Sequence, residues 1–276
     1  MTGTEYSLGH DDPEVRRLLL QGRLYAEHTD RALRLAGIAP GMRVLDVGCG
    51  PGDVSLAAAR VVGPTGSVTG VDATPGILDV AERRAAEHDL PNVEFRSENI
   101  AELSADRPYD AVAGRLILMH LPDPATTVEH LAGLVRTGGV VTFQEFELTA
   151  SRTAPPMPLI DRIGDLTRQS FRALGVSTEM GTSLHRVFRR AGLADPRMNL
   201  SGPLGAATAP ELTEFVADLW RTVLPIAQRL GLDVDGLTDP DAIPERMRAE
   251  AGPDTVVVLP PLISAWSTVR GTSLRA

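Results

Sequence analysis

The chain has 276 residues, a hydrophobic share of 43% and a formal net charge of −9. A nucleic-acid partner would need many phosphate contacts, so this charge argues against one, and no apolar run is long enough to span a bilayer, so no membrane partner is expected. The sequence contains no lysine, which excludes P-loop kinases and pyridoxal enzymes because both require one.

The N-terminal residues show no basic start and no apolar centre, so no secretory signal is visible. Cys49 is the only cysteine, and one cysteine provides neither an internal disulfide nor metal-ligand spacing. We therefore expect a cytoplasmic protein without a metal site. The arginine and alanine bias is typical of a high-GC bacterial genome.

Residues 11–36 carry apolar side chains at helical spacing, from Val15 to Leu35. Gly37 and Pro40 end this segment. The pattern predicts a helical leader, residues 1–39, ahead of the main domain.

Residues 46–52 read Asp-Val-Gly-Cys-Gly-Pro-Gly, after the apolar pair Val44-Leu45 and before a helix-like segment at 54–62. A strand that enters a glycine-rich turn and then a helix is a nucleotide-binding arrangement, because glycine lets the backbone approach a ligand closely. Position 53 is Asp53, where a dinucleotide fingerprint has glycine or alanine. Asp46, at the strand end, suits the ammonium of an amino acid tail better than a pyrophosphate.

Strand-like and helix-like segments alternate from residue 51 to residue 143. This alternation predicts a parallel sheet with helices on both faces. The second strand ends in Asp72, a carboxylate that could accept hydrogen bonds from two ribose hydroxyls or could merely cap the next helix. The next three strands are expected at residues 67–72, 93–97 and 109–115, and residues 134–143 are expected to contain a helix end, a glycine turn and the fifth strand.

The pattern changes after residue 148. Helical periodicity returns over 159–174 and 181–191, residues 197–204 are expected to form the sixth strand, and the β-branched run 255–259 is expected to form the seventh. Between these two strands, residues 205–254 predict two helices, at 209–230 and 240–251, which is far more than a hairpin loop. We expect this insert to fold back as a lid over the acceptor.

The turn at 46–52 resembles motif I of class I S-adenosylmethionine (SAM) methyltransferases, and the elements over residues 40–146 follow in the order of that family. The resemblance implies a Rossmann-like α/β fold with a mostly parallel seven-stranded sheet and an antiparallel last strand. It also implies SAM as cofactor. The expected organisation is a helical cap at 1–39, a SAM-binding core at 40–150, and sheet completion with the lid insert at 151–276.

The resemblance carries a set of cofactor-binding positions. Tyr6 and Gln21 are similar to polar leader residues of bacterial small-molecule methyltransferases, although ordinary surface residues would look the same. The full expected set is Tyr6, Gln21, Asp46, Gly48, Gly50, Gly52, Asp72, Ala73, Asn99, Ile100 and Arg115.

Methyl transfer from a sulfonium depends mainly on positioning, so the catalytic residues are sought where ligands bind, at the carboxyl ends of the fourth and fifth strands. His120 lies in Leu-Met-His-Leu-Pro-Asp, a sequence common in quinone-pathway methyltransferases, and is either a general base or a packing residue. Glu145 could contact the acceptor, orient a base, or form a salt bridge with Arg115.

The expected function is methyl transfer from SAM to a small, partly apolar metabolite in bacterial secondary metabolism. Whether the protein forms a homodimer stays open. Base-modifying methyltransferases carry a Pro-Pro-aromatic motif that is absent after the fourth strand. Two alternatives stay open: a SAM-fold protein that acts as a cyclase or regulator without methyl transfer, and a nicotinamide-dependent oxidoreductase. Asp53 and the lack of a Tyr-x-x-x-Lys pair disfavour the second.

Overall fold

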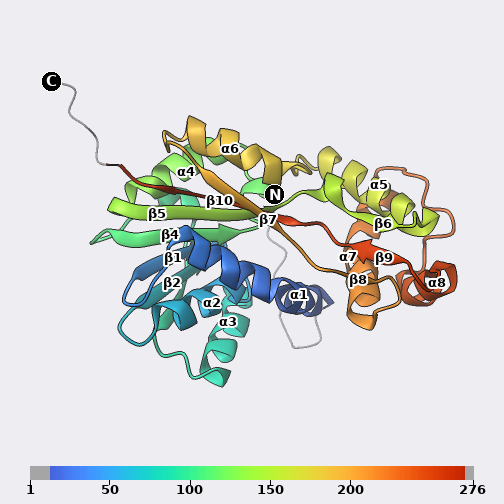
Figure 1. The fold of residues 1–276 in the computed structure, drawn as a ribbon, viewed down its shortest axis with the longest axis horizontal. Coiled ribbons are helices and arrows are strands. Elements are labelled where there is room, and N and C mark those ends of the chain that lie inside the picture. Colours follow the sequence, from blue (N-terminus) through green and yellow to red (C-terminus); the bar gives the residue numbers. More distant parts are fainter. Residues whose placement is uncertain (1–12, 271–276) are drawn as a thin grey trace.

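A computed structural model describes residues 13–270 of the chain. Its main sheet has seven strands in the order β3-β2-β1-β4-β5-β10-β7 (Figure 1). The first five pair in parallel, whereas β10 runs antiparallel to both of its neighbours. The expected Rossmann-like sheet with an antiparallel last strand is thus confirmed. The strands are β1 Arg43–Val47, β2 Ser67–Asp72, β3 Val93–Ser97, β4 Tyr109–Arg115, β5 Val135–Phe146, β7 Arg197–Ser201 and β10 Leu262–Thr268.

Helices cover both faces of this sheet, because successive strand residues point to opposite sides. In β1, Val44 belongs to a core cluster with Leu33 of the N-terminal helix, while Leu45 belongs to the cluster on the other face, with Leu184. The helices are α1 Pro13–Ala36, α2 Asp53–Val62, α3 Pro75–Glu87, α4 Pro124–Gly133, α5 Pro158–Ala173, α6 Met180–Arg190, α7 Pro210–Arg229 and α8 Ile243–Glu250, with short 3-10 helices η1 Ile100–Glu102, η2 Leu118–His120, η3 Leu148–Ala150 and η4 Pro240–Ala242. Over residues 13–270, no helix has the length and apolar character to span a membrane.

The expected seventh strand at 255–259 is wrong. Residues Val256–Val258 form β9, the middle strand of a separate antiparallel sheet with β6 Arg152–Ala154 and β8 Leu204–Ala206. The strand that completes the main sheet is β10. The two are divided at Pro260-Pro261, since proline has no N–H to donate to a sheet ladder.

The insert contains both expected helices, α7 and α8. Together with α5 and the small sheet they lie at one end of the molecule, beyond the main sheet and beside α1 (Figure 1). Much of the apolar face of α7 is used in packing: Trp220 and Val223 are fully buried, and the Trp220 indole donates a hydrogen bond to Leu237 O at 2.7 Å. Phe215 and Leu219 instead border a cavity.

Candidate functional site

A cavity of about 580 Å³ lies where β1, β2 and β4 end, beneath the first half of α1. The carboxyl ends of strands are the usual ligand-binding edge of an open α/β sheet. The cavity brings together six of the residues expected from the sequence: Gln21, Gly48, Gly50, Asp72, Arg115 and His120. Tyr6 lies outside the described residues.

The glycine turn after β1 needs glycine for two different reasons. Gly48, Gly50 and Gly52 all have positive φ, at 65°, 51° and 88°, a backbone region that disfavours other residues. A Cβ on Gly48 would lie 2.8 Å from the Ile117 side chain, and one on Gly52 would lie 3.1 Å from Ala81 and Phe95. A Cβ on Gly50 would meet nothing within 4 Å, so its backbone borders open space in the cavity.

Asp72 lines the cavity at the end of β2. Its carboxylate accepts hydrogen bonds from Gly50 N at 3.0 Å and from Thr74 N at 2.9 Å. The N-cap residue of α3 is Thr74, so the interpretation of Asp72 as a helix cap is wrong. A carboxylate has about four acceptor positions, and those left over can accept from ligand hydroxyls.

Asp46 is completely buried behind the turn and does not line the cavity. One carboxylate oxygen accepts from the Ser55 hydroxyl at 2.6 Å, and the other has no hydrogen-bond partner within residues 13–270. Burial raises the pKa of Asp46 to about 7. The hydrogen bond to Ser55 connects the end of β1 to α2. A cofactor role for Asp46 stays a prediction.

Asp53 is the centre of a charged cluster under α1. From the sequence it was noted only as a departure from the dinucleotide pattern. Its carboxylate contacts Arg115 Nη2 at 2.7 Å and Arg84 Nη1 at 2.8 Å, and Arg115 also donates to the Thr29 hydroxyl at 3.0 Å. A Cβ on Gly22 would lie 2.4 Å from the Asp53 carboxylate. Arg115 therefore pairs with Asp53, and the suggested salt bridge to Glu145 is wrong.

The cavity face of α1 carries a short polar row. Arg17 pairs with Glu14 at 2.6 Å and donates to the Gln21 side chain at 3.1 Å. All three line the cavity. Glu14 was not among the site residues predicted from the sequence, although the spacing Glu14–Arg17–Gln21 places all three on one helical face.

Five of the expected cofactor residues in the described part of the chain do not line this cavity: Asp46, Gly52, Ala73, Asn99 and Ile100. Ala73 and Asn99 are exposed, and Asn99 accepts a hydrogen bond from Ala101 N at 3.1 Å. The contact of these five residues with the cofactor stays a prediction.

Glu145 is fully buried beneath the loop that follows β4. Its carboxylate accepts hydrogen bonds from the backbone amides of residues 117, 118 and 119, at 3.1, 2.8 and 3.4 Å. Burial raises its pKa to about 8. In the same loop, Leu116 has a φ of 58°, a strained value for a bulky residue. Glu145 thus holds the loop in place and does not face the cavity.

His120 ends this loop and lines the cavity at an exposed position. The protein packed against its ring lowers the pKa of His120, and the nearby Arg17 cation lowers it further. A neutral imidazole at a ligand cavity can accept a proton.

Comparisons with known proteins agree with this geometry. A family model described as a methyltransferase domain matches residues 38–192, more than half of the chain. The ubiquinone biosynthesis O-methyltransferase of Paracidovorax citrulli (strain AAC00-1) is 38% identical over 130 residues, which are 45% of this chain and 53% of that protein. The demethylmenaquinone methyltransferase of Staphylococcus aureus (strain JH9) is 28% identical over 184 residues, 61% of this chain and 74% of that protein. The alignment thus spans about half the length of the first of these relatives.

Solved structures share the fold. A methyltransferase of Bacillus halodurans C-125, described as putative, superposes with a TM-score of 0.58 at 16% identity, over 88% of this chain and 99% of that one. The phosphoethanolamine N-methyltransferase 2 of Haemonchus contortus, solved with S-adenosylhomocysteine, gives a TM-score of 0.55 at 15% identity, over 89% of this chain and 53% of that one.

Proposed function

The chain belongs to the class I S-adenosylmethionine-dependent methyltransferases, and from that premise we propose that it transfers the methyl group of SAM to a small, partly apolar metabolite. The observation that carries the proposal is the cavity at the strand ends, where the open Gly50 backbone and the Asp72 carboxylate face the same space. Its volume of about 580 Å³ lies in the range of small-molecule sites.

The residues present fit SAM better than a dinucleotide. Asp53 stands at the first position of α2, where a dinucleotide fingerprint has glycine or alanine so that the turn can hold a pyrophosphate. Asp72 provides acceptors for ribose hydroxyls, and the Gly50 turn leaves room for the amino acid tail. When bound, SAM supplies an activated methyl group, so the task of the protein is to align the acceptor and exclude water.

A small and partly apolar acceptor is supported by two observations. The net charge of −9 disfavours a polyanionic substrate. One relative is named for ubiquinone biosynthesis and another for demethylmenaquinone. Both ubiquinone and demethylmenaquinone are small molecules with apolar parts. We propose further that the insert, about residues 205–254, influences the choice of acceptor.

The first test is Asp72→Ala. Hydrogen bonds to a charged group contribute roughly 1.5–3 kcal/mol, so the affinity for S-adenosylhomocysteine is expected to fall at least about tenfold in calorimetry. The matched control is Asp110→Ala: Asp110 also accepts a backbone amide, Arg43 N at 2.8 Å, and pairs with Arg136, but at the opposite end of β4. The Asp110→Ala control should have a lower thermal midpoint but an unchanged affinity for S-adenosylhomocysteine. Equal affinities for the two variants would contradict the cofactor site.

A second test asks whether His120 acts as a base. The neutral form would be the active one, so the rate at saturating substrate should rise with pH through a midpoint below about 6.5, the ordinary imidazole pKa. The protein around the His120 ring partly shields it from water and lowers its pKa, and the Arg17 cation lowers it further. His120→Ala should lower the rate roughly 100-fold and flatten the profile. Arg17→Gln should move the midpoint to higher pH. A His120→Ala enzyme that keeps both rate and profile would show that alignment alone drives transfer.

A further inference from the structure

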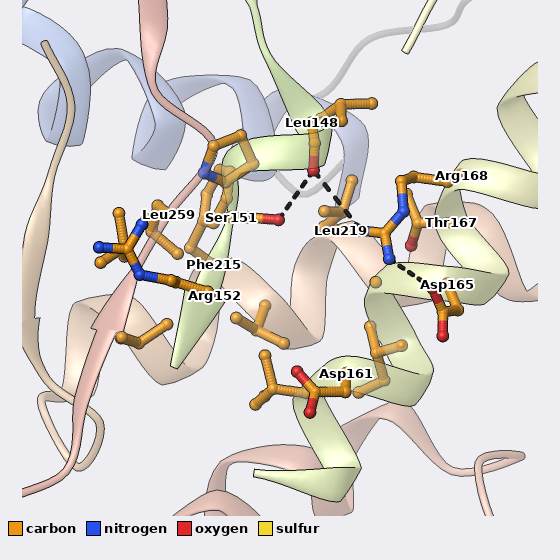
Figure 2. Close-up of a pocket in the computed structure, with 17 residues that line it drawn as sticks. Leu148, Ser151, Arg152, Asp161, Asp165, Thr167, Arg168, Phe215, Leu219 and Leu259 are labelled. Carbon is orange, nitrogen blue, oxygen red and sulfur yellow. Dashed lines mark hydrogen bonds and ion pairs between the residues drawn. The ribbon is translucent and has the colours of Figure 1, made fainter. Parts of the chain in front are cut away.

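A second cavity, of about 380 Å³, lies between α5, α7 and the strands β6 and β9 (Figure 2). Within the described residues it shares no lining residue with the cofactor cavity. Its lining residues come from 148–168 and 257–260 and, within the insert, from 215–219. No step of the proposed methyl transfer uses it.

Tyr25 of α1 stands beside this cavity. Its buried hydroxyl donates to Pro260 O at 2.8 Å, and its ring centre lies 6.2 Å from that of Phe215. Pro260 and Phe215 line the second cavity, whereas Leu18 and Gln21, one to two turns earlier on α1, line the first. Tyr25 thus contacts residues that line the second cavity, while earlier turns of the same helix line the first.

The second cavity combines apolar walls with an unused polar atom. Ile160, Val216 and Leu219 contribute apolar surface. Thr167, on the α5 wall in Figure 2, is 4% exposed, and its hydroxyl has no hydrogen-bond partner within residues 13–270. A buried polar group without a partner costs about 1–3 kcal/mol, so a ligand atom that bonds to this hydroxyl would remove that cost.

The lining includes two arginines, Arg152 and Arg168, and two aspartates, Asp161 and Asp165, so the formal charges balance but lie on different sides of the cavity. Arg168 pairs with Asp165 and also donates to Leu148 O at 3.5 Å. Arg152, an exposed residue on β6, has no ion-pair or hydrogen-bond partner for its side chain among the described residues. Figure 2 shows Arg152 on the strand side and Asp161 on the helix side. A negative group on a ligand is therefore favoured toward β6.

We propose that this cavity is a second small-molecule site, separate from the cofactor site, for an apolar ring compound that carries hydrogen-bond-accepting oxygen atoms and a negative charge. The apolar walls would bury the ring, Thr167 would donate to an oxygen, and Arg152 would attract the charge. The proposal does not depend on methyl transfer.

The probe for the test is 8-anilinonaphthalene-1-sulfonate, which has aromatic rings and a sulfonate, titrated by fluorescence into the full chain. Gly164 lines the cavity within α5, and a Cβ there would meet only the flexible end of Arg168, at 3.2 Å. Gly164→Leu should fill the space and weaken probe binding roughly tenfold or more, while Gly164→Ala should change it less than about threefold. Both changes replace a helical glycine, which favours the helix.

Two further variants test the polar contacts. Arg152→Gln, at an exposed position, should weaken the probe about two- to fivefold. Thr167→Val should weaken it while raising the thermal midpoint of the free protein, because a buried hydroxyl without a partner is removed. Unchanged probe affinity in Gly164→Leu and Arg152→Gln would overturn the proposal, as would displacement of the probe by S-adenosylhomocysteine. Failure of S-adenosylhomocysteine to bind would contradict the proposed function and leave this site standing.

Discussion

Gly48→Val is expected to lower the affinity for SAM and for S-adenosylhomocysteine by roughly 10- to 100-fold or more, measured by calorimetry. The Cβ of the new side chain would lie 2.8 Å from Ile117, which itself lines the cofactor cavity. Either Ile117 moves into the cavity or the glycine turn shifts. Overpacking of this kind typically costs 1–3 kcal/mol, and each 1.4 kcal/mol of binding free energy corresponds to about a factor of ten.

Gly63→Val is the matched control, because Gly63 has the same φ of 65° but no atom within 4 Å of a Cβ. It ends α2, away from the cavity. Both variants introduce backbone strain, so both should lower the thermal midpoint. If Gly63→Val weakens the cofactor as much as Gly48→Val does, the loss comes from general destabilisation and the glycine turn is not the cofactor site.

Asp53→Ala is expected to lower the free energy of unfolding by about 3–5 kcal/mol, measured by urea denaturation. The Arg115 and Asp53 side chains are only 6% and 10% exposed, and removal of one partner leaves the other charge buried without compensation. Arg84 loses an ion pair at the same time. The variant should also bind SAM more weakly, because Arg115 lines the cavity and Asp53 fixes its position.

The control for this variant is Asp30→Ala. Asp30 pairs with Arg34 on α1 at 2.9 Å, but the two side chains are 43% and 61% exposed. Exposed ion pairs are screened by solvent and contribute little to stability, so the loss should be small and cofactor affinity unchanged. An Asp53→Ala protein no less stable than Asp30→Ala would show that the charged cluster under α1 does not hold the helix in place.

The first half of the fold follows from local patterns. The predicted strands at 67–72, 93–97 and 109–115 have the bounds observed for β2, β3 and β4. In each, a β-rich run lies between helical segments, and the order of the elements determines the parallel pairing. The long helices α5, α6 and α7 were predicted to within a residue or two, because their apolar side chains recur at helical spacing.

The choice between two similar β-rich runs depended on tertiary structure. Residues 256–258 and 262–268 both favour strands, yet only β10 fits between β5 and β7, where six of its seven residues are buried. Strand propensity reflects packing against neighbours more than backbone preference. Partners distant in the chain therefore decided which run completed the main sheet.

The sequence by itself determined the glycine turn, the acidic end of β2 and the family, because these depend on residues that are close together in the chain. Only the tertiary structure decided what the isolated charges do. Asp53 reaches Arg115, 62 residues later, and Glu145 reaches the amides of a loop 26 to 28 residues earlier. A buried carboxylate must find donors wherever the fold brings them, and no local pattern in the chain records which donors those are.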